Sequence, residues 1–116
     1  MIKVIVAGGR DFDNYELLKT KLDFLLKEVT EPIEIVSGTA NGADKLGEKY
    51  AREKGLPIKQ FPADWSLGRG AGYIRNKQMA EYATHCVCFW DEKSKGTQHM
   101  INLAKAEELK LRVVKY

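Results

Sequence analysis

The run IKVIVA at residues 2–7, followed at once by GGRDF at residues 8–12, decides the fold class. The run is almost continuously apolar, which is typical of a strand that is buried on both faces of a parallel sheet. The run HCVCFW at residues 85–90 has the same character. Two such runs predict a sheet that is covered by helices on both faces.

Further segments extend this sheet on either side. Five β-rich segments are predicted to be strands: Ile2–Ala7, Ile33–Ser37, Pro57–Phe61, His85–Trp90 and Leu111–Lys115. Four segments with helical spacing lie between them, and the third of these has Ile74, Gln78 and Tyr82 near Met79. Strands that alternate with helices predict an α/β fold, a three-layer doubly wound sandwich with a five-stranded, mainly parallel sheet.

Length and charge limit the class of protein. The 116 residues predict one domain, residues 1–116, which can bury a core without disulfides or metals. The net charge is +3 with acids and bases interspersed, so nucleic acid is predicted to be an unlikely partner and a small anion a suitable one. The sequence shows neither an apolar segment long enough for a membrane span nor a signal region, which predicts a cytoplasmic protein without a membrane partner.

The two cysteines, Cys86 and Cys88, stand two residues apart in a predicted strand, where strand periodicity directs both side chains to one face. Buried, reduced thiols are the simpler interpretation. A metal or redox pair with His85 or His99 is the alternative, but a second ligand cluster is missing, so no metal site is predicted.

The loops that follow three of the predicted strands are short, polar and rich in glycine. In an open parallel sheet these loops meet at one edge, where glycines let backbone amides approach a ligand and the following helices offer unpaired N–H groups to an anion. The predicted ligand-binding residues are Gly8, Gly9, Arg10 and Asp11 in the first loop, Ser37, Gly38, Thr39, Ala40, Gly42, Ala43 and Asp44 in the second, and Ser94, Lys95, Gly96 and Thr97 in the last. The alternative is that these residues only form tight turns and helix caps.

Two other regions are predicted to reach the same edge. The irregular stretch Ala63–Gly72 contains Trp65 and three glycines, and is predicted to be a mobile loop that closes over a ligand. Arg75 and Asn76 follow near the start of the third helix and could contact a phosphate, although Arg75 could instead pair with a carboxylate on a solvated face. Asp44 could contact a sugar hydroxyl or cap its own helix. His99 is a candidate to line the site, whereas His85 is interpreted as structural.

Two common nucleotide fingerprints are absent. VAGGRDF lacks the G-x-G-x-x-G spacing of dinucleotide-binding folds, and SKGT lacks the order of a Walker loop. The sequence therefore excludes an ordinary NAD dehydrogenase and a P-loop NTPase.

Five motifs in order resemble the YspA-type branch of the SMF/DprA-LOG, or SLOG, superfamily: GGRDF, SGTANGADKLGEKYA, FPADW, AGYIRNKQMAEYA and FWDEKSKGTQHMI. The resemblance implies a Rossmann-like fold that binds nucleotides or nucleotide-derived ligands, often in sensors or carriers, with no further cofactor required. It also implies pairing of two copies through helices that flank the site, so a homo-oligomer is expected, with Tyr73, Met79 and Tyr82 as an apolar face. The alternative is that these three side chains only cover the sheet. By analogy with the DprA branch it leaves open a DNA-associated module, which the low charge disfavours.

The LOG branch, the cytokinin-activating phosphoribohydrolases, offers a closer comparison. Its helix with an Arg-Lys pair and a following Met is similar to Arg75, Asn76 and Met79, and its P-G-G-x-G-T-x-x-E loop is similar to residues 93–100. The glutamate of that loop falls on Met100, which cannot accept a proton or stabilise a sugar cation. The resemblance thus implies binding more strongly than catalysis. The alternative is an N-glycosidase in which Arg75 orients the substrate and a carboxylate of Asp11, Asp44, Asp64 or Asp91 stabilises the transition state.

Overall fold

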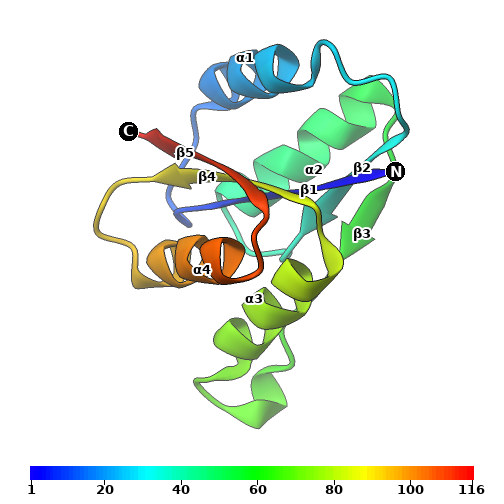
Figure 1. Cartoon of the computed structure of the whole chain (residues 1–116). Helices are drawn as coiled ribbons and strands as arrows, with labels where there is room; N and C mark the ends of the chain where they lie inside the picture. Colours follow the sequence, from blue (N-terminus) through cyan, green and yellow to red (C-terminus); the bar gives the residue numbers. More distant parts are fainter.

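The computed structural model describes residues 1–116 and has five strands that alternate with four helices (Figure 1). The elements in chain order are β1 (Ile2–Gly8), α1 (Tyr15–Leu26), β2 (Ile33–Ser37), α2 (Ala43–Lys54), β3 (Ile58–Gln60), the 3₁₀ helix η1 (Trp65–Leu67), α3 (Ala71–Tyr82), β4 (His85–Trp90), α4 (Lys95–Ala106) and β5 (Lys110–Lys115). All four strand pairings are parallel. The predicted α/β, doubly wound, Rossmann-like sandwich is confirmed.

The strand order is β3-β2-β1-β4-β5, so the chain first builds outward on one side of β1 and then crosses to the other side. Because parallel crossovers are right-handed, this reversal places α1 and α2 on one face and α3 and α4 on the opposite face, as Figure 1 shows. The first face has a core around Leu18, Leu22 and Phe89, and the second has one around Met79 and Met100. A crevice is expected beside β1 and β4, where the order reverses.

Close packing of α2 on the sheet depends on a glycine. A Cβ on Gly47 would lie 2.8 Å from the Cβ of Val6, so the helix can approach β1 this closely only without a side chain at that position. The approach brings the first turn of α2 beside the loop that follows β1, where the Ala43 amide donates to the Gly9 carbonyl at 3.2 Å. Two loops from neighbouring strands are therefore fixed to each other.

β1 and β5 are each one residue longer than predicted, and the larger differences from the predictions lie in three other places. β3 is shorter than predicted, with Pro57 and Phe61 outside it. The stretch Ala63–Gly72 is not irregular throughout, because Asp64 caps η1 by accepting hydrogen bonds from Ser66 and α3 already begins at Ala71. The face of α3 that was predicted to pack on the sheet is wrong as well, because Ile74 is 48% exposed. The buried face has instead both polar and apolar residues: Ala71, Arg75, Asn76, Met79 and Ala80.

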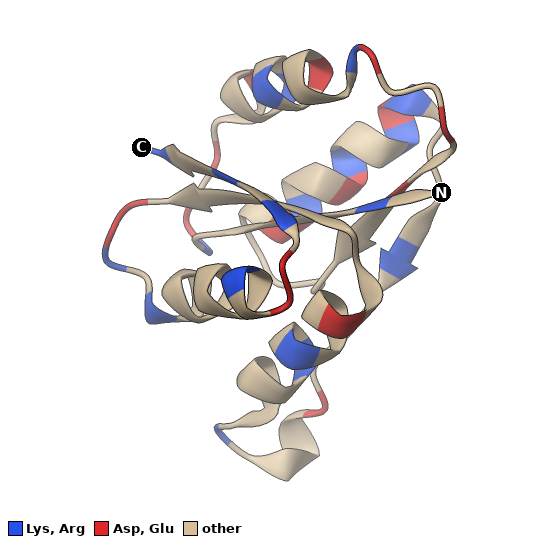
Figure 2. Ribbon diagram, viewed as in Figure 1, with Lys and Arg blue, Asp and Glu red and all other residues tan.

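None of the helices is both long enough and apolar enough to cross a bilayer. Basic and acidic residues alternate around the molecule, most visibly along α2 (Figure 2). Cys86 and Cys88 are both buried, with their sulfur atoms 3.5 Å apart and no disulfide between them, as the strand periodicity predicted.

Candidate functional site

A cavity of about 490 Å³ opens at the carboxyl ends of β1, β2 and β4, beneath the first turns of α3, and is called here the strand-edge cavity. Its position is the one at which the strand order reverses, where ligands of open parallel sheets bind. The predicted residues that line it are Gly8, Gly9, Arg10, Asp11, Ala40, Asp44, Trp65, Arg75, Asn76, Asp91, Ser94, Gly96 and Thr97. The structure thus brings the three glycine-bearing loops and α3 together.

Other predicted residues do not line the cavity. They are Ser37, Gly38, Thr39, Gly42, Ala43 and Lys95, together with the candidate acid Asp64. Ser37 is 1% exposed and its hydroxyl donates to Glu48 at 2.6 Å, so it supports the loop from below. Asp64 caps η1, as described above, which is the physical reason that it does not face the cavity.

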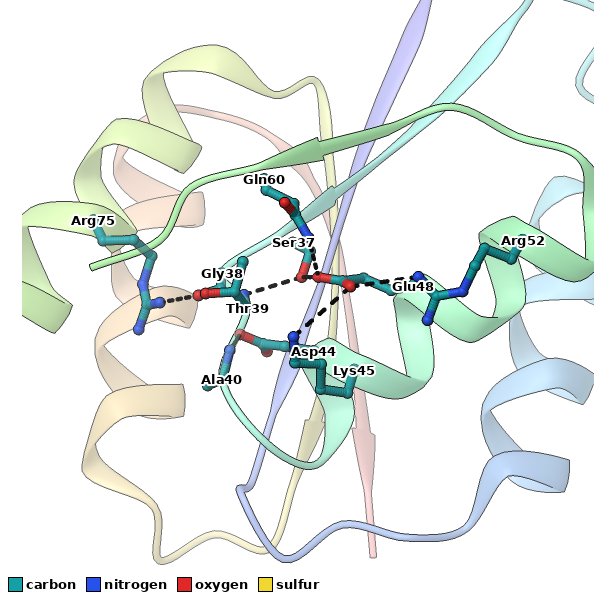
Figure 3. Close-up of polar contacts among 10 residues, drawn as sticks. All are labelled: Ser37, Gly38, Thr39, Ala40, Asp44, Lys45, Glu48, Arg52, Gln60 and Arg75. Atoms are coloured by element: carbon teal, nitrogen blue, oxygen red, sulfur yellow. Dashed lines mark hydrogen bonds and ion pairs between the residues drawn. The ribbon is translucent and has the colours of Figure 1, made fainter. Parts of the chain in front are cut away.

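The loop between β2 and α2 is fixed by its own neighbours (Figure 3). The Thr39 amide donates to the Ser37 hydroxyl at 3.0 Å and the Ala40 amide donates to Asp44 Oδ2 at 3.1 Å. The Arg75 guanidinium donates to the Gly38 carbonyl. The Thr39 and Ala40 amides, which the sequence suggested for phosphate binding, are therefore already bonded within the protein. Thr39 has a left-handed backbone conformation in this loop, with φ of 66°.

Gly38 sets the spacing of the two buried charges in this region. A Cβ at Gly38 would lie 2.7 Å from Asp44 Oδ2 and 2.8 Å from Arg75 Nη1. The carboxylate and the guanidinium consequently stand on either side of Gly38 and can approach it only because it has no side chain. They are 6% and 8% exposed.

Burial dominates the electrostatics of this pair. Burial raises the pKa of Asp44 from 3.8 to about 6, while the hydrogen bond from Ala40 and the positive charge of Arg75 oppose the shift. Burial also lowers the pKa of Arg75, which the charge of Asp44 opposes. Arg75 thus does not lie on a solvated face; together with Asp44 it forms the buried side of the cavity, called here the deep wall, and it compensates in part for the buried carboxylate.

Asn76 connects α3 to α4. Its Oδ1 accepts from Arg75 Nε at 3.0 Å, and its Nδ2 lies 3.4 Å from the Gly96 carbonyl and 3.3 Å from His99 Nδ1. The His99 ring packs on Tyr73, with centroids 4.3 Å apart. His99 does not line the cavity itself, but it holds two residues that do.

The first turn of α4 has the features of an anion site. Ser94 caps the helix by accepting from the Thr97 amide at 3.3 Å, and Asp91 accepts from the Lys93 and Ser94 amides at 2.8 and 2.9 Å. These hydrogen bonds lower the pKa of Asp91. The amides of Lys95 and Gly96 have no partner within the protein and point along the positive end of the helix dipole.

Six residues that line the cavity were not predicted: Ala7, Arg69, Gly72, Tyr73, Met79 and Met100. Arg69 adds a third guanidinium to those of Arg10 and Arg75. Trp65 and Tyr73 are 57% and 48% exposed, and Arg10 lies 5.9 Å from the centre of the Trp65 ring. The spacing of Gly72, Asn76 and Met79 along α3 was a usable signal for part of this set, because it places all three on one helix face.

A second buried carboxylate escaped the sequence analysis. Glu48 is 2% exposed and accepts from Ser37 and from Gln60, with Lys45 and Arg52 at 4.0 and 3.7 Å (Figure 3). Glu48 lies within the motif SGTANGADKLGEKYA, but no role was predicted for it from the sequence, because a glutamate in a charged helix is ordinarily solvated.

The apolar face that the sequence suggested for pairing of two copies also changes. Met79 is 1% exposed and packs under the helix, and the Tyr82 hydroxyl donates to Glu34. The prediction that Met79 belongs to an exposed apolar face is therefore wrong, because Met79 lies on the buried side of α3. The exposed apolar side chains of this region are Trp65, Leu67, Tyr73 and Ile74, and pairing of two copies stays a prediction.

Comparison with solved structures identifies a protein with the same fold. DNA processing protein A from Helicobacter pylori, described for its mode of binding single-stranded DNA, matches with a TM-score of 0.66 and 20% sequence identity over 97% of this chain. The match spans 64% of the length of that protein. The prediction that nucleic acid is an unlikely partner is wrong, because a protein of this fold binds single-stranded DNA and a low net charge does not exclude such a partner.

No curated protein matches the sequence. A family model, in contrast, matches residues 2–68, which include β1, the β2–α2 loop and η1 and make up more than half of the chain. The matched part contributes the Gly8–Asp11 loop, Asp44 and Trp65 to the strand-edge cavity. The motif resemblance is confirmed, and the chain belongs to the YspA, cpYpsA-related SLOG family.

Proposed function

We propose that this protein binds a nucleotide or a nucleotide-derived small molecule in the strand-edge cavity, as a sensor or carrier. The observation that carries the proposal is the combination, in one cavity, of free helix amides, three arginines and two exposed aromatic rings. Phosphate oxygens suit the Lys95 and Gly96 amides and the guanidinium of Arg10 or Arg69. A base suits the rings of Trp65 and Tyr73, because stacking on aromatic faces needs little more than exposure.

The size and the charge of the cavity agree with such a ligand. A volume of about 490 Å³ lies within the range of small-molecule sites, roughly 300–1,000 Å³. Three aspartates also line the cavity, but Asp91 is neutralised in part by two amides and Asp44 by its burial beside Arg75. The phosphate end is therefore expected at α4, away from Asp44.

A thermal-shift panel tests the proposal. AMP, ADP-ribose, NAD, ATP and a cyclic nucleotide are compared with adenosine, which has the base and sugar but no phosphate. A ligand at about a hundred times its dissociation constant adds about 2.7 kcal/mol to stability, which is several degrees for a chain of this size. The proposal fails if no phosphorylated compound moves the midpoint, or if adenosine moves it as far as AMP.

Replacing Gly96 by Ala is expected to weaken nucleotide binding about tenfold without harming the fold. A Cβ at Gly96 meets no atom within 4 Å, and alanine favours the helix by up to about 1 kcal/mol over glycine. The added methyl group is expected to reduce the room for a phosphate at the first turn of α4, where Gly96 lines the cavity. Calorimetric titration of a nucleotide found in the panel, with a denaturation curve for each variant, measures both effects.

Gly70→Ala is the matched control for this variant. Gly70 also has no neighbour within 4 Å of a built Cβ and precedes a helix, but it does not line the cavity. Its substitution is expected to leave binding unchanged. Equal affinities of wild type and Gly96→Ala would place the phosphate elsewhere.

Hydrolysis of an N-glycosidic bond is the second candidate, supported by the carboxylates of Asp11, Asp44 and Asp91 in the cavity. The position at which the hydrolytic relatives have a glutamate is Met100, which is 1% exposed and lines the cavity with an apolar side chain. Binding without turnover is therefore the preferred proposal. Release of free base from a nucleoside monophosphate by the wild-type protein would reverse this preference.

A strand of nucleic acid is a second source of nucleotides to be tested, since the structural neighbour binds single-stranded DNA. A short single-stranded oligonucleotide belongs in the same panel. The slope of the logarithm of the binding constant against the logarithm of the salt concentration reports how many phosphates are contacted. A slope that corresponds to several phosphates would indicate contacts beyond one nucleotide.

A further inference from the structure

The deep wall of the strand-edge cavity contains two charged groups that each keep one polar atom unused. Asp44 accepts a hydrogen bond from the Ala40 amide through Oδ2, and no group of the protein bonds to its Oδ1. Arg75 uses Nε and Nη1 for Asn76 and Gly38, and its Nη2 has no partner. Both residues are more than nine-tenths buried and both line the cavity.

These free atoms are open to the cavity rather than enclosed in protein. Every fully buried side-chain nitrogen and oxygen in the structure has a hydrogen-bond partner, so atoms without one retain some accessible surface. A buried carboxylate oxygen and a buried guanidinium nitrogen without partners are energetically unfavourable until a ligand or water satisfies them.

The two groups do not satisfy each other. No ion pair joins them within 4.0 Å, and a Cβ at Gly38 would contact the bonded atom of each group, Asp44 Oδ2 and Arg75 Nη1. The protein therefore holds the carboxylate and the guanidinium on either side of Gly38 without pairing them (Figure 3). A ligand that satisfies both free atoms must donate to Asp44 Oδ1 and accept from Arg75 Nη2.

Hydroxyl groups meet this requirement, because each can donate one hydrogen bond and accept others. A phosphate oxygen does not, since it has no proton to donate to an ionised carboxylate. A base edge offers both functions, but the stacking surfaces for a base, Trp65 and Tyr73, are at the exposed rim. Between a base at the rim and a phosphate at α4, the part of a nucleotide left for the deep wall is its sugar.

We propose that Asp44 and Arg75 bind the vicinal hydroxyls of a ribose, so that the cavity selects ribonucleotides over 2′-deoxyribonucleotides. This inference rests on the nucleotide-binding function proposed above. Removing one hydroxyl leaves a buried charged group without its partner. Hydrogen bonds to charged groups of this kind correspond to roughly a ten- to hundredfold difference in affinity.

Calorimetric titration with matched pairs tests the selectivity: AMP against 2′-deoxy-AMP, and ATP against 2′-deoxy-ATP. The wild-type protein is expected to bind the ribo form at least about tenfold more tightly in each pair that binds. This measurement needs no variant, so it does not depend on the folding of a mutant. Equal affinities for the two members of a pair would overturn the inference and leave the proposed function intact, whereas no binding of these four or of any other nucleotide in the panel would overturn both.

The variant Asp44→Asn assigns the selectivity to its residue. An amide keeps the shape of the carboxylate and an oxygen for the Ala40 amide, but it loses the charge that holds a hydroxyl proton. The ribo-to-deoxy ratio is expected to fall towards one, mainly through weaker binding of the ribo form. Asp91→Asn is the control, because it removes a charge from the same cavity at the α4 end: it changes both affinities together and leaves the ratio as in wild type. A ratio that survives in Asp44→Asn would overturn the assignment.

Discussion

Asp44→Asn is expected to raise the free energy of unfolding by about 3 kcal/mol at pH 8. Asp44 ionises in the unfolded chain near 3.8 and in the folded protein near 6, so the folded state holds this proton more tightly. As the pH rises from about 4 to above 6, the folded state must ionise a buried group and loses stability. A difference of about two pKa units corresponds to about 3 kcal/mol, which an uncharged amide avoids.

Urea denaturation of both proteins between pH 4 and pH 8 measures this effect. The difference between variant and wild type is expected to be small near pH 4, to grow through pH 5 and 6, and to be constant above about pH 7. Other titrating groups are shared by the two proteins and largely cancel. Asp91→Asn is expected to have the opposite effect. Backbone amides lower the pKa of Asp91, so its charge stabilises the fold above the pKa of the unfolded chain, and the variant that lacks this charge is less stable than wild type at pH 8. An Asp44→Asn variant that is less stable than wild type at pH 8 would contradict the burial argument.

Gly42→Ala is expected to destabilise the protein by about 3 kcal/mol or more, and to weaken ligand binding with it. Gly42 has a φ of 79°, and a Cβ there would lie 2.2 Å from the Gly9 carbonyl oxygen and 2.6 Å from the Arg10 carbonyl carbon. These are rigid backbone atoms, so the β1 and β2 loops must separate. Overpacking of this kind typically costs about 1–3 kcal/mol, and the left-handed backbone adds about 1–2 kcal/mol for any residue with a Cβ.

Gly55→Ala separates the two contributions. Gly55 ends α2 with a φ of 68°, but nothing lies within 4 Å of its built Cβ. Its substitution is expected to cost about 1 kcal/mol, from the backbone alone. Denaturant midpoints with unchanged m-values would give the two differences. Similar losses for the two variants would mean that the clash at Gly9 is relieved by a small movement and that the loops are not held together as described.

The fold could be predicted because the buried strands leave a direct signature. The runs at residues 2–7 and 85–90 are apolar at consecutive positions, which only strands covered on both faces require. The edge strand β3 was less well defined, since two of its three residues are exposed and carry no apolar pattern. Helix α3 was assigned the wrong face for a related reason: its inner surface covers a polar cavity as well as the sheet, so buried Arg75 and Asn76 interrupt the apolar stripe that periodicity detects.

The sequence predicted which loops form the site, but not which of their polar atoms are free to bind a ligand. Glycine content and parallel topology were sufficient to bring Gly8, Asp44 and Gly96 to one cavity. The sequence could not show that the Thr39 and Ala40 amides are already bonded within their own loop, because that depends on side-chain orientations set by tertiary packing. It also could not show that Glu48, in a charged helix, is buried beneath that loop.

The loops of the strand-edge cavity differ in how they are anchored, and this has a consequence for divergence within the family. The loops after β1 and β2 share the hydrogen bond from Ala43 to Gly9, and α3 holds the Gly38 carbonyl, so a change in one of them disturbs the others. Between Asp64 and Gly68, in contrast, the backbone hydrogen bonds run from Leu67 to Asp64 and from Gly68 to Trp65, and one more joins the segment to the first residue of α3, from Ala71 to Gly68. Insertions and substitutions there leave the sheet and the deep wall unaffected. Relatives can therefore acquire new ligand preferences by exchanging this short segment while they keep the remainder of the cavity.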